Sequence, residues 1–319
     1  MKVVITGGTG FIGSRLAASL LADGHHVIIL TRQQPHDATM RHPSLENATW
    51  ILWPGDARQD DQPVSWKNAL DGADAIVHLA GASIAAGRWN NRRKAAIRHS
   101  RVESTRRLVQ VLGQLSRPPR LLISASAVGY YGSRGDEVLT EQSTPGSDFL
   151  ASVCREWEAA ADTARSLGVR VVKLRTGLVL DARAGALPRM TLPFRLFLGG
   201  PLGNGQQWIP WIHIRDHVRL IRFLLQHPEA NGPVNGTAPN PVTNRQFARV
   251  LARQLHRPSV FPTPAPLLRL ALGEMADALL LASQRAIPKQ AMDWGFSFEF
   301  CRLEDALADL FPRSSLFPR

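Results

Sequence analysis

The first thirteen residues, MKVVITGGTGFIG, most constrain what this chain can fold into. Lys2–Thr6 is a short apolar, β-branched run with the composition of a strand that is buried on both faces. A glycine turn follows directly, and from Phe11 onward apolar residues recur with the 3.6-residue period of a helix. This order of strand, turn and helix predicts the first βα unit of a parallel sheet.

The turn carries Gly7, Gly10 and Gly13 with the spacing G-x-x-G-x-x-G. Gly7 permits a tight turn, Gly10 lets backbone approach a phosphate, and Gly13 lets helix and strand pack closely. Free N–H groups at the start of the helix, around Phe11 and Ile12, form an anion site at its positive dipole end. A sharp βα turn alone would also explain the glycines, but their place between strand and helix favours a dinucleotide site.

The second predicted strand, His26–Thr31, is followed directly by Arg32. This position lies about twenty residues past the glycine motif, where an acidic residue would bind the ribose diol of NAD. The chain has no Asp or Glu there, and an arginine suits the 2′-phosphate of NADP because its guanidinium bonds phosphate oxygens in pairs. The alternative is an ordinary surface arginine after a strand. The sequence therefore predicts NADP(H) as the cofactor.

Small residues follow the fourth predicted strand, Asp74–Leu79. Ala80 and Gly81 let the backbone pass close to the adenosine ribose. Arg101 lies on the next helix, predicted over Asn90–Leu115, where it can reach a phosphate or face solvent. Strands and helices continue to alternate to about residue 180, which predicts a Rossmann-type, doubly wound parallel sheet of the α/β class. Its ligand should lie beyond the carboxyl ends of the strands.

Composition narrows the class of partner. The net charge is +12, and only five of the 38 basic residues are lysines. They are spread along the chain with one dense cluster at 88–94, and no nucleic-acid motif accompanies them, so a basic surface with a local anion site is preferred to specific nucleic-acid binding. With two cysteines and no secretory leader, the sequence predicts a cytoplasmic protein. It contains no apolar run of membrane-spanning length, so no membrane partner is expected. No metal site is predicted either. For the oligomeric state, a homodimer is one possibility.

Seven stretches carry a resemblance to the extended short-chain dehydrogenases/reductases, and more narrowly to their atypical epimerase-like family (NAD-dependent epimerase/dehydratase-like). They are ITGGTGFIG (5–13), HLAGASIAAGRW (78–89), SASAVGYYG (124–132), DFLASVCREWEAAA (148–161), LRTGLVL (174–180), LPFRLFLGGPLGNGQQWIPWIHIRD (192–216) and NGTAPNPVTN (235–244).

The resemblance implies a Rossmann-type domain over residues 1–228 and a smaller, substrate-covering part over 229–319, with a family-specific module at about 250–300. It also implies NADP(H) at the glycine motif, an oxidoreductase or epimerase activity, and a small substrate, with a sugar nucleotide as one option. Beside the cofactor it would place Arg32, Leu79, Ala80, Arg101 and Val179.

The catalytic pair of that superfamily is absent from the expected helix. Its members use a Tyr and, four residues later, a Lys that lowers the Tyr pKa so that a proton can pass at neutral pH. On the helix predicted over Phe149–Leu167 those places fall at Leu150 and Cys154. A non-catalytic NADP(H)-dependent sensor or scaffold is therefore the main rival to an enzyme.

The remaining candidate proton carriers are Ser126, Tyr130, Tyr131 and His213. The hydroxyls lie at the end of the fifth predicted strand, where they can equally close hydrogen bonds at the edge of the sheet. His213 can line a substrate pocket, or it can sit in a packed bend with its ring satisfied by backbone. Asp216 is predicted to cap the helix that follows this bend.

Overall fold

The computed structural model describes residues 1–34, 37, 40–53 and 65–312. A parallel seven-stranded sheet forms its centre and confirms the predicted Rossmann-type, doubly wound fold. From one edge to the other, the strands are β11 (Gly232–Gly236), β7 (Arg170–Thr176), β5 (Leu121–Ala127), β4 (Ala75–His78), β1 (Lys2–Thr6), β2 (His26–Thr31) and β3 (Thr49–Leu52).

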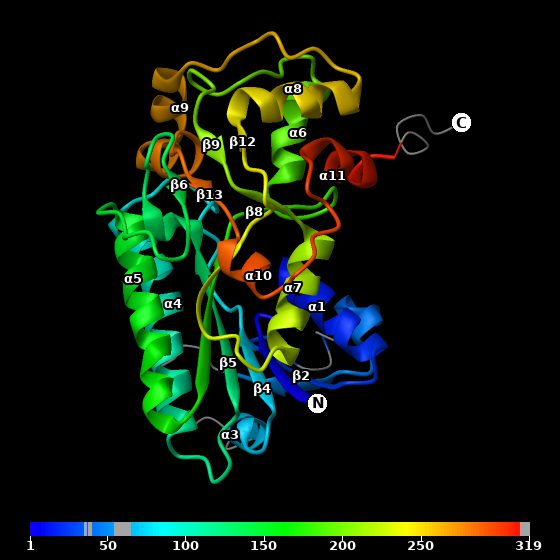
Figure 1. Ribbon diagram of the computed structural model, residues 1–319, viewed down its shortest axis with the longest axis vertical. Coiled ribbons are helices and arrows are strands. Elements are labelled where there is room, and N and C mark those ends of the chain that lie inside the picture. The colour runs from blue at the N-terminus through cyan, green and yellow to red at the C-terminus, as the bar shows by residue number, and fades with distance from the viewer. Residues whose placement is uncertain (35–36, 38–39, 54–64, 313–319) are drawn as a thin grey trace.

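Helices cover both faces of this sheet (Figure 1). One face packs against α1 (Phe11–Ala22) and α7 (Ile214–Gln226), and the other against α3 (Ser65–Leu70), α4 (Asn91–Leu112) and α5 (Phe149–Asp162). The central strands are apolar throughout because both of their faces are buried. Val3, Val4 and Ile5 of β1, for example, have no exposed surface.

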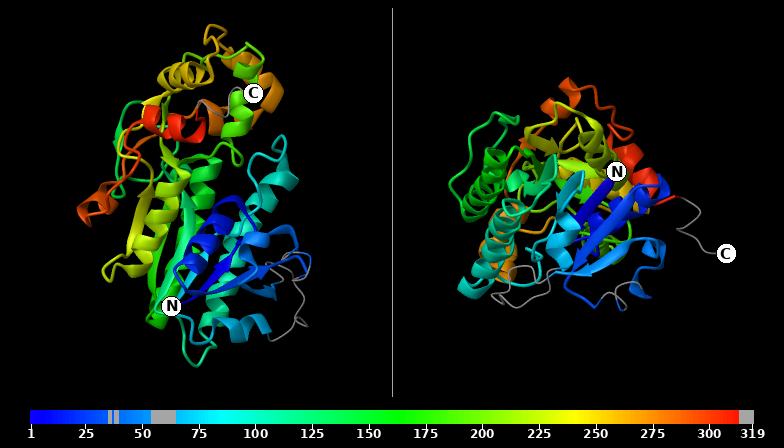
Figure 2. Two further views of the ribbon diagram at one scale, coloured as in Figure 1. Left: turned by 90° about the vertical axis from the view of Figure 1, so that its right-hand side faces the viewer. Right: turned by 90° about the horizontal axis from the view of Figure 1, so that it is seen from below.

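A second lobe lies beyond the carboxyl ends of the sheet strands (Figures 1 and 2). Its core gathers apolar residues from three helices, α6 (Leu187–Arg195), α8 (Asn244–Leu255) and α11 (Leu303–Leu310). The helices of the lobe are α6, α8, α9 (Ala265–Leu272), a π-helical turn (Ala276–Leu280) and α11, and its short strands are β8 (Leu178–Leu180), β9 (Trp208–Ile209), β10 (Trp211–His213) and β12 (Val242–Thr243).

The C-terminal segment is joined to the main sheet. Helix α10 (Lys289–Asp293) packs against β11, and its Ala291 belongs to the same apolar core as β1. Strand β13 (Arg285–Ala286) pairs with β6 (Val138–Leu139). The sheet thus uses a strand that follows residue 228, and the segment after it braces the sheet edge. No helix in the described part of the chain is long and apolar enough to cross a membrane.

Candidate functional site

The tight turn between β1 and α1 has a backbone conformation and close contacts that require glycine. Gly7 has a φ of +71°, which favours glycine, and the N–H of Gly10 donates to its carbonyl oxygen at 2.9 Å. A Cβ on Gly13 would overlap that same oxygen and lie 2.8 Å from the Cα of Gly8. Gly10 caps α1, and no side chain accepts a hydrogen bond from the first N–H groups of the helix. This arrangement is suited to a phosphate group.

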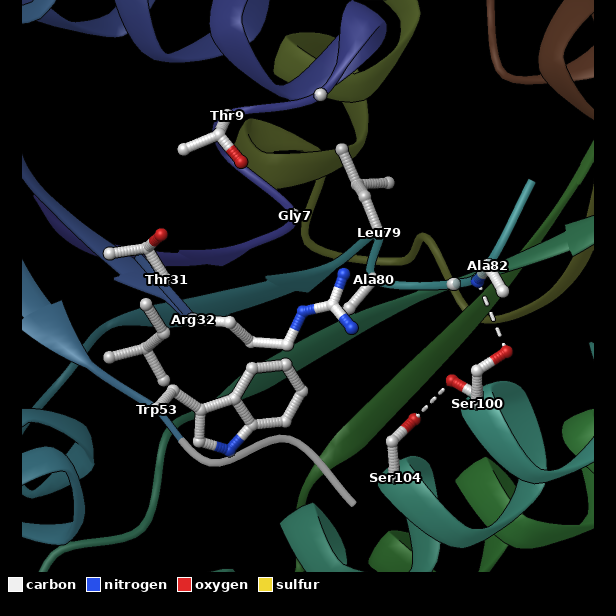
Figure 3. A pocket seen from close by; sticks show the side chains of 13 residues that line it. Gly7, Thr9, Thr31, Arg32, Trp53, Leu79, Ala80, Ala82, Ser100 and Ser104 are labelled. Carbon is white, nitrogen blue, oxygen red and sulfur yellow. Dashed lines mark hydrogen bonds between the residues drawn. The ribbon is translucent and has the colours of Figure 1, made fainter. Parts of the chain in front are cut away.

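A pocket opens at the carboxyl ends of β1, β2, β3 and β4, next to this turn (Figure 3). Six of its lining residues are predicted cofactor residues: Gly7, Gly10, Arg32, Leu79, Ala80 and Gly81. The side chain of Arg32 extends across the pocket between Trp53 and Ala80 in Figure 3. None of the described lining residues is acidic; the remaining ones are Thr9, Leu30, Thr31, Trp53, Ala82, Ser100 and Ser104.

Five predicted cofactor residues lie outside this lining. Gly13 supports the turn from beneath, and Ile12 packs against the apolar core. Phe11 faces Gly185, whose added Cβ would lie 2.9 Å from the ring, and Val179 is buried in β8. Arg101 lies just behind the lining, because a Cβ on Gly81 would be 3.3 Å from its guanidinium carbon. Of the five side chains, that of Arg101 is therefore the one placed to reach a pocket ligand.

Arg101 is a half-buried cation with no carboxylate partner in the described part of the chain. One guanidinium nitrogen donates to the Ile97 carbonyl at 3.1 Å, and the group lies over the Trp157 ring, 5.3 Å from its centroid. Burial lowers the pKa of Arg101 from its ordinary value. An anionic group in the pocket would therefore be favoured here, because it would compensate a partly desolvated charge.

Three further residues, Trp53, Ser100 and Ser104, line the pocket without having been predicted to do so. Trp53 directly follows β3, is 3% exposed and forms one wall. Its position at the carboxyl end of a parallel strand was the signal available for it. The two serines lie on α4, and nothing in the local pattern separates them from other polar residues of that helix.

His78 ties the pocket wall to the helices behind it. Its Nδ1 lies 2.7 Å from the Thr6 hydroxyl, and its Nε2 lies 3.0 Å from the Thr105 hydroxyl. Thr6 accepts the Ala80 N–H at 3.3 Å, and Thr105 accepts the indole N–H of Trp157 at 3.0 Å. Burial lowers the pKa of His78 to about 4, so the ring is neutral in the folded protein. His78 therefore positions the turn and the pocket wall.

Acidification below pH 6.5 is expected to destabilise the protein through His78 and His217. Burial lowers both pKa values from 6.5 to about 4. The unfolded chain therefore binds protons between these pH values while the folded chain does not, and stability present above pH 6.5 is lost as the pH falls. One unit is about 1.4 kcal/mol for each ring, so together they should remove about 3 kcal/mol between pH 7.5 and 5.5. Urea unfolding at the two pH values measures this.

The variant His78→Gln should lose about half of that pH dependence. The matched control is His26→Gln, which changes an exposed ring at the start of β2 and should keep the full pH dependence. Equal stability of the unmodified protein at both pH values would contradict the assignment of two neutral buried rings.

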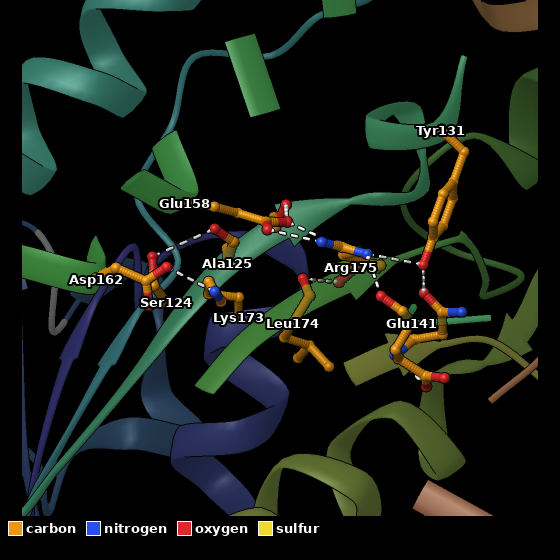
Figure 4. Close-up of polar contacts among 12 residues, drawn as sticks. Ser124, Ala125, Tyr131, Glu141, Glu158, Asp162, Lys173, Leu174 and Arg175 are labelled. Carbon is orange, nitrogen blue, oxygen red and sulfur yellow. Dashed lines mark hydrogen bonds and ion pairs between the residues drawn. The ribbon is translucent and has the colours of Figure 1, made fainter. Parts of the chain in front are cut away.

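Two of the predicted catalytic hydroxyls, those of Ser126 and Tyr131, lie in a buried polar network (Figure 4). Ser126 donates to Glu158 at 2.7 Å, and Glu158 accepts two hydrogen bonds from Arg175 at 2.8 and 2.9 Å. Arg175 also donates to the Tyr131 hydroxyl at 3.0 Å and to the Glu141 carbonyl at 3.1 Å. The network joins β5, β7 and α5, and within it the Ser126 and Tyr131 hydroxyls both have partners inside the protein.

Tyr131 has no exposed surface and donates its hydroxyl to Asn235 at 2.7 Å. Burial raises its pKa to about 12, although Arg175 opposes the shift. These contacts give Tyr131 a structural role. Tyr130 is only partly buried, and Arg175 lies 3.5 Å from its ring centroid. Of the two tyrosines, Tyr130 is the one whose hydroxyl is left for a substrate.

The expected catalytic helix offers no replacement pair. Cys154 lies at the place of the lysine, is buried, and has its pKa raised to about 12 by that burial. A thiol held neutral in this way is a packing residue and a poor nucleophile. Leu150 at the place of the tyrosine packs near Gly129.

His213 lies in the packed bend, one of the two alternatives left open by the sequence. Its Nδ1 accepts the Arg215 N–H at 3.1 Å, so it caps α7, and its ring stacks on Phe300 at 4.0 Å. Burial lowers its pKa, and the nearby Asp309 opposes the shift. The predicted cap, Asp216, instead accepts the N–H groups of Glu299 and Phe300 from inside the first turn of α7. Both side chains fasten the C-terminal segment to this helix.

Two sequence profiles match the chain. The profile described as the NAD dependent epimerase/dehydratase family covers residues 3–236, and a domain of unknown function (DUF1731) covers residues 263–310. A *Bacillus subtilis* relative, the epimerase family protein YfhF, is 39% identical over 97% of this chain and 98% of its own length. The chloroplastic SDR39U1 homolog of *Arabidopsis thaliana* is 41% identical over 96% of this chain and 86% of its own.

Solved structures show the same architecture. Human epimerase family protein SDR39U1, crystallised with NADPH, superposes with a TM-score of 0.85 at 32% identity over 98% of this chain and all of its own. A nucleoside-diphosphate sugar epimerase from *Corynebacterium glutamicum* gives a TM-score of 0.75 at 36% identity, covering 97% of this chain and 58% of that one.

Proposed function

Because the chain belongs to the NAD dependent epimerase/dehydratase family, we propose that it is an NADP(H)-binding, epimerase-like oxidoreductase acting on a small substrate. The observation that carries the choice of cofactor is the pocket lining, in which Arg32 follows β2 and no described residue is acidic. An arginine recognises a 2′-phosphate, whereas a ribose diol is usually held by a carboxylate. The human relative crystallised with NADPH supports the same choice.

The residues present fit a dinucleotide. Gly7 and Gly13 leave room for backbone alone, the first turn of α1 offers free N–H groups, and Arg101 lies behind Gly81 as a second cation. When bound, the cofactor supplies or accepts a hydride. The protein's own contribution is to hold the pyrophosphate at α1 and the 2′-phosphate at Arg32.

The substrate would enter between the sheet and the second lobe, at the carboxyl ends of the strands. A sugar nucleotide is one option, supported by the *C. glutamicum* epimerase at 36% identity. Tyr130 is the candidate proton carrier, because Tyr131 and His213 are held by other contacts.

A non-catalytic NADP(H)-dependent sensor is the second candidate function. It is favoured by the absence of the catalytic Tyr/Lys pair from α5, where Leu150 and the buried Cys154 occupy the two places. A screen separates the two functions: protein purified with its cofactor is incubated with carbonyl metabolites, and oxidation of NADPH is followed by absorbance. Turnover that is reduced in Tyr130→Phe supports the enzyme, whereas binding without turnover supports the sensor.

The variant Arg32→Ala is expected to weaken NADPH binding roughly ten- to a hundredfold and to leave NADH binding nearly unchanged. Hydrogen bonds to a charged group contribute about 1.5–3 kcal/mol, which corresponds to that range of affinity. Because Arg32 is exposed, solvent screening should bring the loss toward the lower end. Calorimetric titration of both cofactors measures it.

Arg120→Ala provides the matched control, because Arg120 is also exposed but precedes β5 at the opposite end of the strands. It should bind both cofactors as the unmodified protein does. A preference of the unmodified protein for NADH, or an equal loss of both cofactors in Arg32→Ala, would refute the NADP assignment.

A further inference from the structure

Six large apolar side chains stand exposed on two short segments of the second lobe. They follow one another at the end of α6 and in the connector after α8, and each is between 52% and 66% exposed: Leu192, Leu196, Phe197, Leu198, Val260 and Phe261. These six side chains and the exposed arginines of α8, Arg245, Arg249 and Arg253, are together called the arginine–apolar patch. Isolated exposed apolar residues are ordinary, but a contiguous group marks an interaction surface.

The two segments touch one another. The N–H of Phe261 donates to Gly199 at 3.2 Å, and the N–H of Thr263 donates to Pro201 at 2.9 Å. The guanidinium of Arg257 lies 4.6 Å from the centroid of the Phe197 ring. The connector crosses the outer end of the second lobe, at the top of Figure 1. The two segments that carry the exposed apolar side chains therefore lie side by side at this end of the lobe.

Phe197 is held in an unfavourable backbone conformation. Its φ is +62°, and in the described part of the chain only His256 shares a positive φ among residues other than glycine. A bulky side chain in this region costs conformational energy. The ring is 55% exposed, so burial in this chain does not repay that cost. The conformation ends α6 as a Schellman cap, in which the Phe197 N–H donates to Phe194 at 2.9 Å and the Leu198 N–H donates to Pro193 at 2.8 Å. Glycine is the usual residue at this place in the cap, and here an exposed aromatic ring occupies it.

The chain segments that carry these side chains contain basic residues and no acidic ones. Arg245, Arg249 and Arg253 are exposed on successive turns of one face of α8, which leads toward Arg257 and Phe197. No acidic residue occurs between positions 182 and 215 or between 230 and 273. Arg195, Arg249 and Arg253 form no ion pair with any described residue.

Helix α11, which packs against α8, carries three acidic side chains. Two of them have partners elsewhere: Glu304 faces Arg302 at 3.8 Å, and Asp309 pairs with Arg215. Asp305, the third, forms no ion pair with α8 among the described residues. The positive charge of the patch is therefore not neutralised within the protein.

From these observations we infer that the arginine–apolar patch docks the protein on an anionic lipid bilayer. Arginines attract anionic headgroups, and projecting Phe, Leu and Val side chains insert at the boundary between headgroups and acyl chains. A second copy of the chain is a poor occupant, because a twofold contact would set the same arginines against each other. Nucleic acid is also a poor occupant, because its phosphate backbone would bind the arginines but would not bury the exposed leucine and valine side chains.

Such docking needs no spanning helix. The expectation of no membrane partner rested on the absence of an apolar run of spanning length, and a peripheral surface is independent of that criterion. The patch also lies apart from the cofactor pocket, since none of the pocket's described lining residues belongs to it. Docking and cofactor binding can therefore be tested separately.

The test is cosedimentation with vesicles of phosphatidylcholine alone or with 30% phosphatidylglycerol. We expect binding to the anionic vesicles only, and weaker binding as salt is raised. The double variant Arg249→Gln/Arg253→Gln should bind about twenty-fivefold more weakly, since each basic residue near such a surface contributes about fivefold. Phe197→Gly should also bind more weakly while keeping or raising thermal stability, because glycine accepts a φ of +62°.

The control Arg41→Gln/Arg120→Gln removes the same charge from exposed positions outside the patch. It should bind the anionic vesicles as tightly as the unmodified protein. Failure of the unmodified protein to bind these vesicles would overturn the inference, and would leave an acidic protein surface as the occupant to seek. An equal loss in the control pair and the patch pair would overturn it as well.

Discussion

Replacing Arg175 by Met is expected to lower the free energy of unfolding by about 3–5 kcal/mol, the cost of leaving a buried charge without its partner. Arg175 is 3% exposed and Glu158 6% exposed, and the pair is bidentate at 2.8 and 2.9 Å. The change would also remove the donors to Tyr131 and to the Glu141 carbonyl. Methionine keeps much of the side-chain volume, so lost packing contributes little. Urea unfolding at pH 7.5 measures the effect.

Arg165→Met gives the matched comparison. Arg165 pairs with Asp162 at 2.9 Å just after α5, but both side chains are more than a third exposed, so the pair should contribute no more than about 1 kcal/mol. The double variant Arg175→Met/Glu158→Gln should recover part of the stability, since it leaves no buried charge unpaired. A loss in Arg175→Met no larger than that in Arg165→Met would show that the network is not a main support of the fold.

Replacing Gly13 by Ala is expected to weaken NADPH binding by roughly a hundredfold or more. The added Cβ would overlap the Gly7 carbonyl oxygen and lie 2.8 Å from the Gly8 Cα, and both neighbours are backbone atoms that cannot rotate away. Inserting a methyl group into such a contact costs about 1–3 kcal/mol, and more where the surroundings are rigid. The strain falls on the turn that would cradle the pyrophosphate. Calorimetric titration with NADPH, together with a thermal melt, measures both consequences.

Gly113→Ala is the appropriate control for this variant. Gly113 follows α4 with a φ of −69°, and a Cβ there would meet its nearest neighbour at 3.5 Å. Alanine should therefore be tolerated, with unchanged NADPH affinity and equal or slightly higher stability. Undiminished NADPH binding by Gly13→Ala would mean that the turn does not hold the cofactor.

The C-terminal segment shows why the two profile matches form one folded unit. Glu141 accepts the N–H of Asn235 at 3.0 Å and that of Gln290 at 3.2 Å, so one carboxylate links β11 with α10. Burial raises the pKa of Glu141, and these backbone donors oppose the shift. His213 stacking on Phe300 makes a second link. The segment therefore supports the same strands whose carboxyl ends form the pocket.

The sequence by itself determined the βα core and the phosphate turn, because both depend on local chemistry. Strand β1 is a continuous apolar run, α1 has a helical apolar period, and Gly7 must adopt a positive φ. The place of Arg32 after β2 follows equally from strand length and order. These features need no knowledge of which distant residues meet.

The tertiary structure alone decided which polar residues remain available for a ligand. Tyr131 and Asn235 are 104 positions apart, and Arg175 and Tyr131 are 44 apart, so no local pattern shows that the Tyr131 hydroxyl is already held. The sequence left His213 either as a pocket residue or as part of a packed bend, and the stacking of Phe300, 87 positions later, on its ring decided for the packed bend. Trp53 forms a wall of the pocket because β3, which it follows, lies next to β2 in the sheet. Burial and pairing arise from contacts between segments distant in the chain, and those contacts form only when the sheet and the second lobe are assembled.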